Sequence, residues 1–460
     1  MIKEKDLTQG NLWKQIVLFS IPLIFSNLLQ IVFNMADLIV AGQFAGNRAL
    51  GAVGSTSILV TLFTGFAIGM GNGVNVILAR FIGAKRKDDE KQTIYTSLIV
   101  CIIVGIILLI LGVSSANIIL KILKTKPDFL EPATTYLHIY FCGLPALTIF
   151  NYGNGAYSAM GNTRKPLLFL VIGGVINVGL NLLFVIAFKM DVVGVALAST
   201  ISQYISALLI VISLHLGKKE SHYSFEEFTF SARKAKRILL FGLTSGLQYS
   251  IFAIANLFVQ TGVNSFDEAM VQGNAATLYL DTIIYNIMAA FYLACTSFVS
   301  QNYGANNRKR IIASYGITLF YAFSAAALFG LIMYFFGQEA LSIFTKDSSI
   351  IEAGMKKLSI MVFSYFLSTF MDSAVAASRG LGKTLVPTIL VIIGSCIYRI
   401  IWIYTIFRYF ETVESLYLLY PTSWFLTSIL ESTYFAIIYT RIIKKNNNLL
   451  ESNNENKTNS

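Results

Sequence analysis

Long apolar runs separated by short polar segments dominate the chain. The runs reach 20 residues or more, which is the length an α-helix needs to cross the hydrocarbon core of a bilayer. The pattern predicts an all-α, polytopic membrane protein. Its twelve transmembrane helices are expected near residues 14–40, 50–75, 93–115, 134–157, 166–188, 193–215, 238–262, 272–299, 312–337, 357–378, 385–408 and 415–441.

The two halves of the chain resemble each other at a constant spacing of 221 residues. The matching residues are Gly83 and Gly304, Ala84 and Ala305, Ile122 and Ile343, Glu131 and Glu352, Gly161 and Gly382, Thr163 and Thr384, Pro166 and Pro387, and Gly173 and Gly394. Each half holds six spans, an even number, so both enter the membrane in the same orientation. This predicts two parallel-related six-helix lobes around a central binding region, an arrangement typical of secondary transporters.

The repeat sets the expected domain boundaries. Residues 1–216 form the N-lobe and residues 238–442 form the C-lobe. The polar stretch 217–237 is a connecting loop on the cytoplasmic side. The tail 443–460 is rich in Asn, Lys and Glu, and we expect it to be disordered.

Composition and charge support this class. The chain is 55% hydrophobic and 13% charged, whereas soluble domains carry about 25% charged residues. A net charge of +11 could indicate a nucleic-acid partner, but the basic residues lie in short loops between spans. Most of the 35 lysines and arginines fall on the side of the N-terminus, which predicts that both termini are cytoplasmic. We therefore expect a multi-pass protein of the plasma membrane that binds no nucleic acid.

Signals for enzymatic or cofactor chemistry are missing from the sequence. The four cysteines and three histidines are scattered without metal-ligand spacing, and no Gly-x-x-x-x-Gly-Lys-[Ser/Thr] phosphate loop occurs. The acids inside spans are isolated from one another. We expect a monomeric transporter that needs no cofactor, rather than an enzyme.

Asp37 is the leading functional candidate in the first half. A charge inside a span costs roughly 2.5–3.5 kcal/mol on insertion scales, so such residues are functional candidates by default. Asn34 lies one helical turn earlier, and Pro22 and Gly42 flank the acid. A carboxylate beside a bendable helix can bind a proton or a hard cation such as Na+. The alternative is a charge near the outer end of the span that water reaches.

Amides and a hydroxyl in later spans accompany this acid. Asn177 and Asn181 are spaced i, i+4 in the fifth span, and Asn151 and Asn154 are spaced i, i+3 in the fourth. The sixth span begins with small residues and carries Ser199. These groups either serve a binding site or make the interhelical packing hydrogen bonds common in membrane bundles.

The second half carries its own intramembrane acids. Asp372 stands where the first half has Asn151, and Asp281 and Glu431 lie in other spans. They either meet a cationic substrate or form structural ion pairs with Arg379 or Arg399. For Asp281 and Glu431 the sequence favours the structural interpretation. The 35 phenylalanines and 23 tyrosines suit lipophilic cations, although most aromatic residues of a membrane protein face lipid or the interface.

Over residues 10–442 the chain resembles the multidrug and toxic compound extrusion (MATE) family. The motifs that carry the resemblance are Asn34-Met-Ala-Asp37-Leu-Ile-Val-Ala-Gly42, Arg80-Phe-Ile-Gly83-Ala84, Ala159-Met-Gly161-Asn-Thr-Arg-Lys-Pro166, Asn177-Val-Gly-Leu-Asn181, Gly194-Val-Ala-Leu-Ala-Ser199 and Arg379-Gly-Leu-Gly-Lys-Thr384. The resemblance implies a two-lobe antiporter that exports cationic amphiphilic drugs in exchange for Na+ or H+.

The resemblance also assigns roles and reveals departures. Asp37, Asn177 and Ser199 match the cation site of the family's N-lobe. The family's second acid of that site falls on Asn181, which removes one carboxylate. The seventh-span acid of one subgroup is Gln248 here, and the tenth-span acid corresponds to Asp372.

The sequence therefore predicts two groups of functional residues. The ion-coupling group, with Na+ possible at Asp37, is Asp37, Asn177, Asn181 and Ser199. The substrate-binding group between the lobes, for lipophilic cations, is Asn34, Asn151, Asn154 and Asp372. The main alternative is a flippase for lipid-linked precursors, which would require a larger central cavity lined by Arg and Lys.

Overall fold

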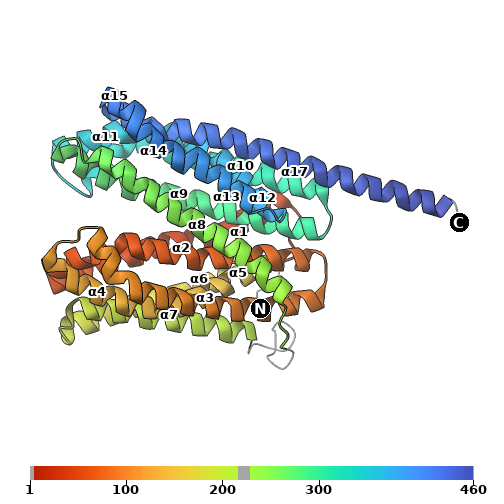
Figure 1. Cartoon of the computed structure of the whole chain (residues 1–460), viewed down its shortest axis with the longest axis horizontal. Coiled ribbons are helices and arrows are strands. Elements are labelled where there is room, and N and C mark those ends of the chain that lie inside the picture. Colours follow the sequence, from red (N-terminus) through yellow and green to blue (C-terminus); the bar gives the residue numbers. More distant parts are fainter. Residues whose placement is uncertain (1–4, 216–227, 459–460) are drawn as a thin grey trace.

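The protein is a two-lobe bundle of helices. The computed structural model describes residues 5–215 and 228–458, and this part of the chain contains no strand. Figure 1 shows the first half as one bundle and the second half as another beside it. The prediction of an all-α protein is confirmed.

The first half contains seven α-helices and two π-helical turns. Its elements are α1 (Leu12–Val40), a π-helical turn (Ala41–Ala45), α2 (Asn47–Gly83), α3 (Lys87–Ile122), α4 (Pro127–Cys142), α5 (Leu144–Ala159), α6 (Arg164–Leu182), a π-helical turn (Leu183–Ala187) and α7 (Asp191–His215). Helix α1 continues through Pro22 without a break.

The second half follows the same plan. Its elements are α8 (Ala232–Val263), α9 (Glu268–Gly304), α10 (Arg308–Ser342), α11 (Ser348–Val362), α12 (Tyr365–Gly380), α13 (Leu385–Val391), a π-helical turn (Ile392–Ile397), α14 (Tyr398–Trp402), a π-helical turn (Ile403–Phe407), α15 (Arg408–Phe410), α16 (Val413–Tyr417) and α17 (Leu419–Thr458).

Nine helical segments of the described chain are long and apolar enough to cross a membrane. Two further spans are bent pairs, α4 with α5 at 44° and α11 with α12 at 49°. Helix α17 occupies the twelfth predicted position. The outer face of α3 illustrates the lipid-facing surface, since Ile103, Ile106, Ile107 and Ile110 are exposed at helical spacing.

Two boundaries differ from the sequence-based expectation. Helix α8 begins at Ala232, six residues earlier than predicted, because Ser231 caps it by accepting from the Lys234 amide. Helix α17 continues to Thr458, where we expected disorder after residue 442. No Gly or Pro interrupts residues 422–458, so a helix started in the membrane can propagate. Most of the predicted connecting loop, residues 216–227, lies outside the described residues.

The two halves repeat each other in detail. The bent spans break at Gly143 and at Phe363–Ser364, positions that the 221-residue spacing relates. Gly161 and Gly382 both have positive φ, at 77° and 84°, in the loops that follow α5 and α12. The sequence repeat is therefore a structural repeat.

Equivalent ends of the halves meet at one end of the molecule. Gly83 at the end of α2 packs against the backbone of Gln301 in α9, and Gly304 packs reciprocally against the backbone of Arg80. The reciprocal approach is what a two-fold relation between the halves produces. Because equivalent ends touch, the repeats are parallel, as predicted.

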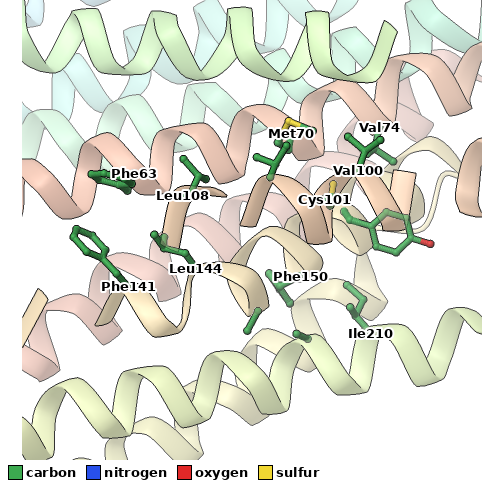
Figure 2. Close-up of a cluster of buried hydrophobic side chains, with 14 of the residues drawn as sticks. Phe63, Met70, Val74, Val100, Cys101, Leu108, Phe141, Leu144, Phe150 and Ile210 are labelled. Atoms are coloured by element: carbon green, nitrogen blue, oxygen red, sulfur yellow. The ribbon is translucent and has the colours of Figure 1, made fainter. Parts of the chain in front are cut away.

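The packing boundary between the lobes does not follow the chain boundary. The N-lobe core, part of which Figure 2 shows with Phe63, Met70 and Phe141, also includes Ala235, Ile238 and Phe241 from the start of α8. Conversely, the C-lobe core includes residues from the start of the chain and of α1, namely Leu7, Leu12, Ile16, Phe19 and Leu23. Each lobe thus contains the first segment of the other half.

Several polar contacts between the two halves lie toward this same end, and a further one, Asn27 of α1 donating to Asn286 O of α9 at 2.9 Å, lies near the middle of both helices. Asn75 of α2 and Ser297 of α9 hydrogen-bond at 2.9 Å, and Lys234 at the start of α8 pairs with Asp89 of α3 at 2.8 Å. Gln301 donates to Ala159 O at 2.6 Å and accepts from the Leu7 amide at 3.0 Å. The lobes are therefore joined at the end that carries the N-terminal segment.

Candidate functional site

The N-lobe gathers all four predicted ion-coupling residues around one carboxylate. Asp37 lies in the last turns of α1. Asn181 Nδ2 donates to its Oδ1 at 2.5 Å, and Ser199 Oγ donates to its Oδ2 at 2.8 Å. Asn177 Nδ2 donates to Ser199 Oγ at 3.3 Å, which makes it a second layer behind the hydroxyl.

Burial and local backbone favour a ligand at this carboxylate. Asn177, Asn181 and Ser199 are buried, and Asp37 is half-buried. The Oδ1 atom of Asn181 is buried without a hydrogen-bond partner in the structure. Two π-helical turns, Ala41–Ala45 and Leu183–Ala187, contact each other beyond the site. Such turns are frequent at functional sites.

Two tyrosines of α4 belong to the same region, although the sequence analysis did not single them out. Tyr136 and Tyr140 are both within electrostatic range of Asp37, and their rings stack at 5.8 Å. Their i, i+4 spacing in a span that also holds amides was the available signal. They place phenol groups beside the carboxylate.

The predicted substrate-binding residues lie on three helices, α1, α5 and α12. Asn34 is exposed on α1, and Asn154 is half-buried in α5. Asn151 donates to Leu147 O of its own helix at 2.9 Å, while its backbone packs against Gly71 of α2. Asp372 lies in the C-lobe, is 8% exposed, and leaves Oδ2 without a hydrogen-bond partner among the described residues. The four residues share no hydrogen bond with one another in the described chain.

The other C-lobe acids differ from the expected arginine pairs. Asp281 pairs with Lys357 Nζ at 2.8 Å and accepts from the Tyr365 hydroxyl. Lys357, the first residue of the tenth predicted span, is only 1% exposed. Glu431 is fully buried, and both its carboxylate oxygens lack a hydrogen-bond partner in the described structure. The partner of Asp281 is thus a lysine, and Glu431 has no ion pair there.

Two repeated helical lobes, joined at one end and carrying a hydrogen-bonded carboxylate within a span, define the protein as a polytopic membrane transporter. The MatE family model matches residues 22–183 and 241–405. The chain therefore belongs to the MatE family of multidrug efflux transporters.

Individual proteins agree with this membership. The probable multidrug resistance protein YpnP of Bacillus subtilis is 29% identical over 370 residues, which cover 79% of this chain and 81% of YpnP. An outward-facing multidrug resistance MATE transporter structure covers 96% of this chain at 23% identity, 99% of its own length and a TM-score of 0.88. A MOP superfamily transporter from Pyrococcus furiosus, described as having a binding pocket of reverse polarity, has the same identity, coverage and TM-score.

Proposed function

We propose that this protein exports amphiphilic cationic compounds in exchange for Na+ or H+ bound at Asp37. The observation that carries the proposal is the ring of Asn181, Ser199 and Asn177 around one half-buried carboxylate. Intramembrane carboxylates with satisfied neighbours and an accessible side are the usual carriers of coupling ions. The names of relatives such as YpnP support the drug substrates.

The oxygen atoms available suit a hard cation as well as a proton. Asp37 supplies two carboxylate oxygens, Ser199 a hydroxyl oxygen and Asn177 an amide oxygen. The buried Oδ1 of Asn181, which lacks a partner, supplies a further oxygen. Na+ prefers such oxygen ligands, whereas proton coupling would use Asp37 alone. Asn181 stands where the family has a second carboxylate, so the site carries less negative charge. The remaining oxygen atoms still suffice as ligands for a cation.

The joined end of the molecule is proposed to face the cytoplasm. The N-terminal segment lies there, and so do the starts of α3, α8 and α10, which are rich in lysine and arginine. The positive-inside rule supports that orientation. The described conformation would then open outward, as does the similar outward-facing transporter.

Asp37→Asn tests the proposal in proteoliposomes. Efflux of ethidium and norfloxacin is measured with Na+ and pH gradients imposed separately. We expect the variant to lose gradient-driven transport, because the neutral amide cannot carry the coupling charge. The matched control is Glu339→Gln, which neutralises an exposed acid on α10. Undiminished coupled transport by Asp37→Asn would remove Asp37 from the mechanism.

The flippase alternative predicts a cationic central region. Arg379 and Arg399 do lie inside the C-lobe, but Asp372 and Glu431 lie in electrostatic range of Arg379. Equal numbers of positive and negative side chains make this region neutral overall. This lack of net positive charge favours the drug exporter over the flippase.

A further inference from the structure

A buried ion pair joins α9 to α11 inside the C-lobe. Lys357 Nζ lies 2.8 Å from Asp281 Oδ2, and the two side chains are 1% and 16% exposed. The neighbouring pair of Lys356 and Glu352 is instead largely exposed, at 3.6 Å. Taking two charges out of water is costly, and their attraction compensates only where further groups bind them. The buried pair therefore needs a supporting shell.

Side chains from several helices supply that shell. Tyr365, the first residue of α12, donates its hydroxyl to Asp281 Oδ1. Lys357 Nζ lies 5.7 Å from the centre of the Tyr417 ring at the end of α16. The Tyr417 hydroxyl donates in turn to Asn274 Oδ1 of α9 at 3.0 Å. The ammonium and the carboxylate are therefore fixed by contacts with α9, α11, α12 and α16.

The 221-residue repeat places Lys357 where the N-lobe has Tyr136. Helices α4 and α11 begin at Pro127 and Ser348, so the register of these two helices follows the repeat. Tyr136 lies within electrostatic range of Asp37, the carboxylate of the proposed ion site. The C-lobe thus has an ammonium group at the position of a phenol beside that site.

At a second repeat position, an aromatic ring replaces a hydroxyl of the proposed ion site. Ser199, which donates to the N-lobe carboxylate, is equivalent to Tyr420. Ser202 Oγ donates to the Ser199 carbonyl at 2.9 Å, and Ser423 Oγ donates to the Tyr420 carbonyl at the same distance. The guanidinium of Arg399 lies 4.6 Å from the centre of the Tyr420 ring. Where the N-lobe offers oxygen atoms to a cation, the C-lobe therefore holds cations of the chain itself.

We propose that the Asp281 carboxylate is a second cation site, permanently occupied by the Lys357 ammonium, so that only the N-lobe exchanges ions. The inference rests on the proposed ion exchange at Asp37 and limits it to one ion per transport cycle. A tethered ammonium excludes Na+ from the same oxygen, because a group already attached to the chain loses no translational freedom on binding. Once the side chain is shortened, a free alkylammonium ion takes its place.

Removal of the tethered ammonium tests the site on the purified full-length protein. Lys357→Ala shortens the side chain by the equivalent of n-propylammonium. We expect the variant to unfold at a lower temperature than the wild type, and n-propylammonium to restore most of that loss. The alcohol n-propanol fills the same space without a charge, and should restore little. The wild type, whose site is filled, should respond to neither compound.

Two variants control this measurement. Lys356→Ala removes the exposed neighbouring lysine, and should unfold close to the wild-type temperature without a response to the amine. Asp281→Asn combined with Lys357→Ala removes the carboxylate as well, and should abolish the difference between amine and alcohol. If the amine stabilises Lys357→Ala no more than the alcohol does, the site is only a cavity and the inference is overturned.

The ion dependence of wild-type transport gives an independent test that needs no substituted protein. Efflux in proteoliposomes should rise with the concentration of the coupling ion as for a single site, with a Hill coefficient of about 1. A Hill coefficient of about 2 would overturn the inference, since two ions would then exchange. Retained gradient-driven transport by Asp37→Asn would instead contradict the proposed function, whatever the response to the amine.

Discussion

At the scale of single residues, the chemistry of the N-lobe depends on how one carboxylate is surrounded. Asp37 receives one hydrogen bond from an amide of α6 and one from a hydroxyl of α7. Under the proposed function, three helices would respond to a cation at the carboxylate, because a bound ion competes for the same oxygens. A ligand that binds one arrangement more tightly than the other shifts the population between them.

Ser199→Ala should lower the affinity of Asp37 for the proposed coupling ion. The variant removes a hydroxyl that donates to Asp37 at 2.8 Å. Hydrogen bonds to charged groups contribute about 1.5–3 kcal/mol, so we expect roughly a tenfold or larger change in the half-saturating ion concentration. Transport at varied Na+ and pH measures it.

The control for that substitution lies on the same helix. Ser202 donates only to the Ser199 carbonyl, at 2.9 Å, so Ser202→Ala removes a buried hydroxyl without touching Asp37. The two variants should differ in ion dependence although they lose the same group. An unchanged ion dependence in Ser199→Ala would contradict the expected role of the hydroxyl.

Residue-level prediction succeeded where helical spacing constrained the partners. Asn177 and Asn181 share a face, and the resemblance to a family site named Asp37 and Ser199, so the sequence could gather all four. It could not find Lys357 as the partner of Asp281, since that pair depends on how α11 packs against α9. Nor could the sequence reveal that the guanidinium of Arg399 lies over aromatic rings, because these rings come from α8 and α17.

At the scale of helices, glycines set how closely the lobes approach. A Cβ on Gly69 of α2 would lie 2.5 Å from Gly242 O and 2.6 Å from Gly246 N of α8. These neighbours are backbone atoms and cannot rotate away. Gly69 is therefore a position where α2 and α8 cross in close backbone contact.

Gly69→Ala should force α2 and α8 apart. Overpacking of this kind costs about 1–3 kcal/mol, so thermal unfolding in detergent should shift to lower temperature. Gly54→Ala on the same helix is the matched control, because its Cβ would meet open space and alanine is the better helix former. Equal melting temperatures for the two variants would refute the close crossing.

Helix ends were harder to foresee than helix existence. Twelve apolar runs gave the spans, but nothing in periodicity alone marked the bends at Gly143 and Ser364. The early start of α8 depends on a cap at Ser231, which also donates its amide to Thr96 of α3. Tertiary contacts of this kind decide boundaries that local pattern leaves open.

At the scale of the whole molecule, the two lobes close at one end through a small set of polar contacts. Gln301 is central among them, because its side chain bonds the N-terminal segment and the end of α5 at once. Arg310 holds the same segment by donating to the carbonyls of Leu7, Gln9 and Gly10. Of these bonds, the one from Gln301 to Ala159 crosses between the lobes and must break if they are to separate at this end.

Gln301→Leu should shift the population toward the opposite opening. The variant removes the hydrogen bond from Gln301 to Ala159 O between the lobes, which contributes about 0.5–1.5 kcal/mol, and every 1.4 kcal/mol corresponds to a tenfold change in population. Spin labels at Glu131 and Glu352, equivalent exposed positions at the far ends of the lobes, report the separation. We expect a larger fraction of shorter distances in the variant.

The labelling experiment needs two controls. The exposed Cys142 is replaced by Ser so that only the introduced cysteines react. Gln338→Leu makes the same substitution at an exposed position of α10, and should leave the distances unchanged. Identical distance distributions in Gln301→Leu and the wild type would show that these bonds do not hold the end closed.

The exchange of first segments between the lobes bears on the origin of the chain. Residues at the start of α1 complete the C-lobe core, and residues at the start of α8 complete the N-lobe core. Neither half can then mature as an independent module. Residues 1–215 and 228–460, produced as separate polypeptides, should accumulate only when expressed together. A single-copy ancestor with this architecture would have been a domain-swapped homodimer, and gene fusion would have locked that exchange into one polypeptide.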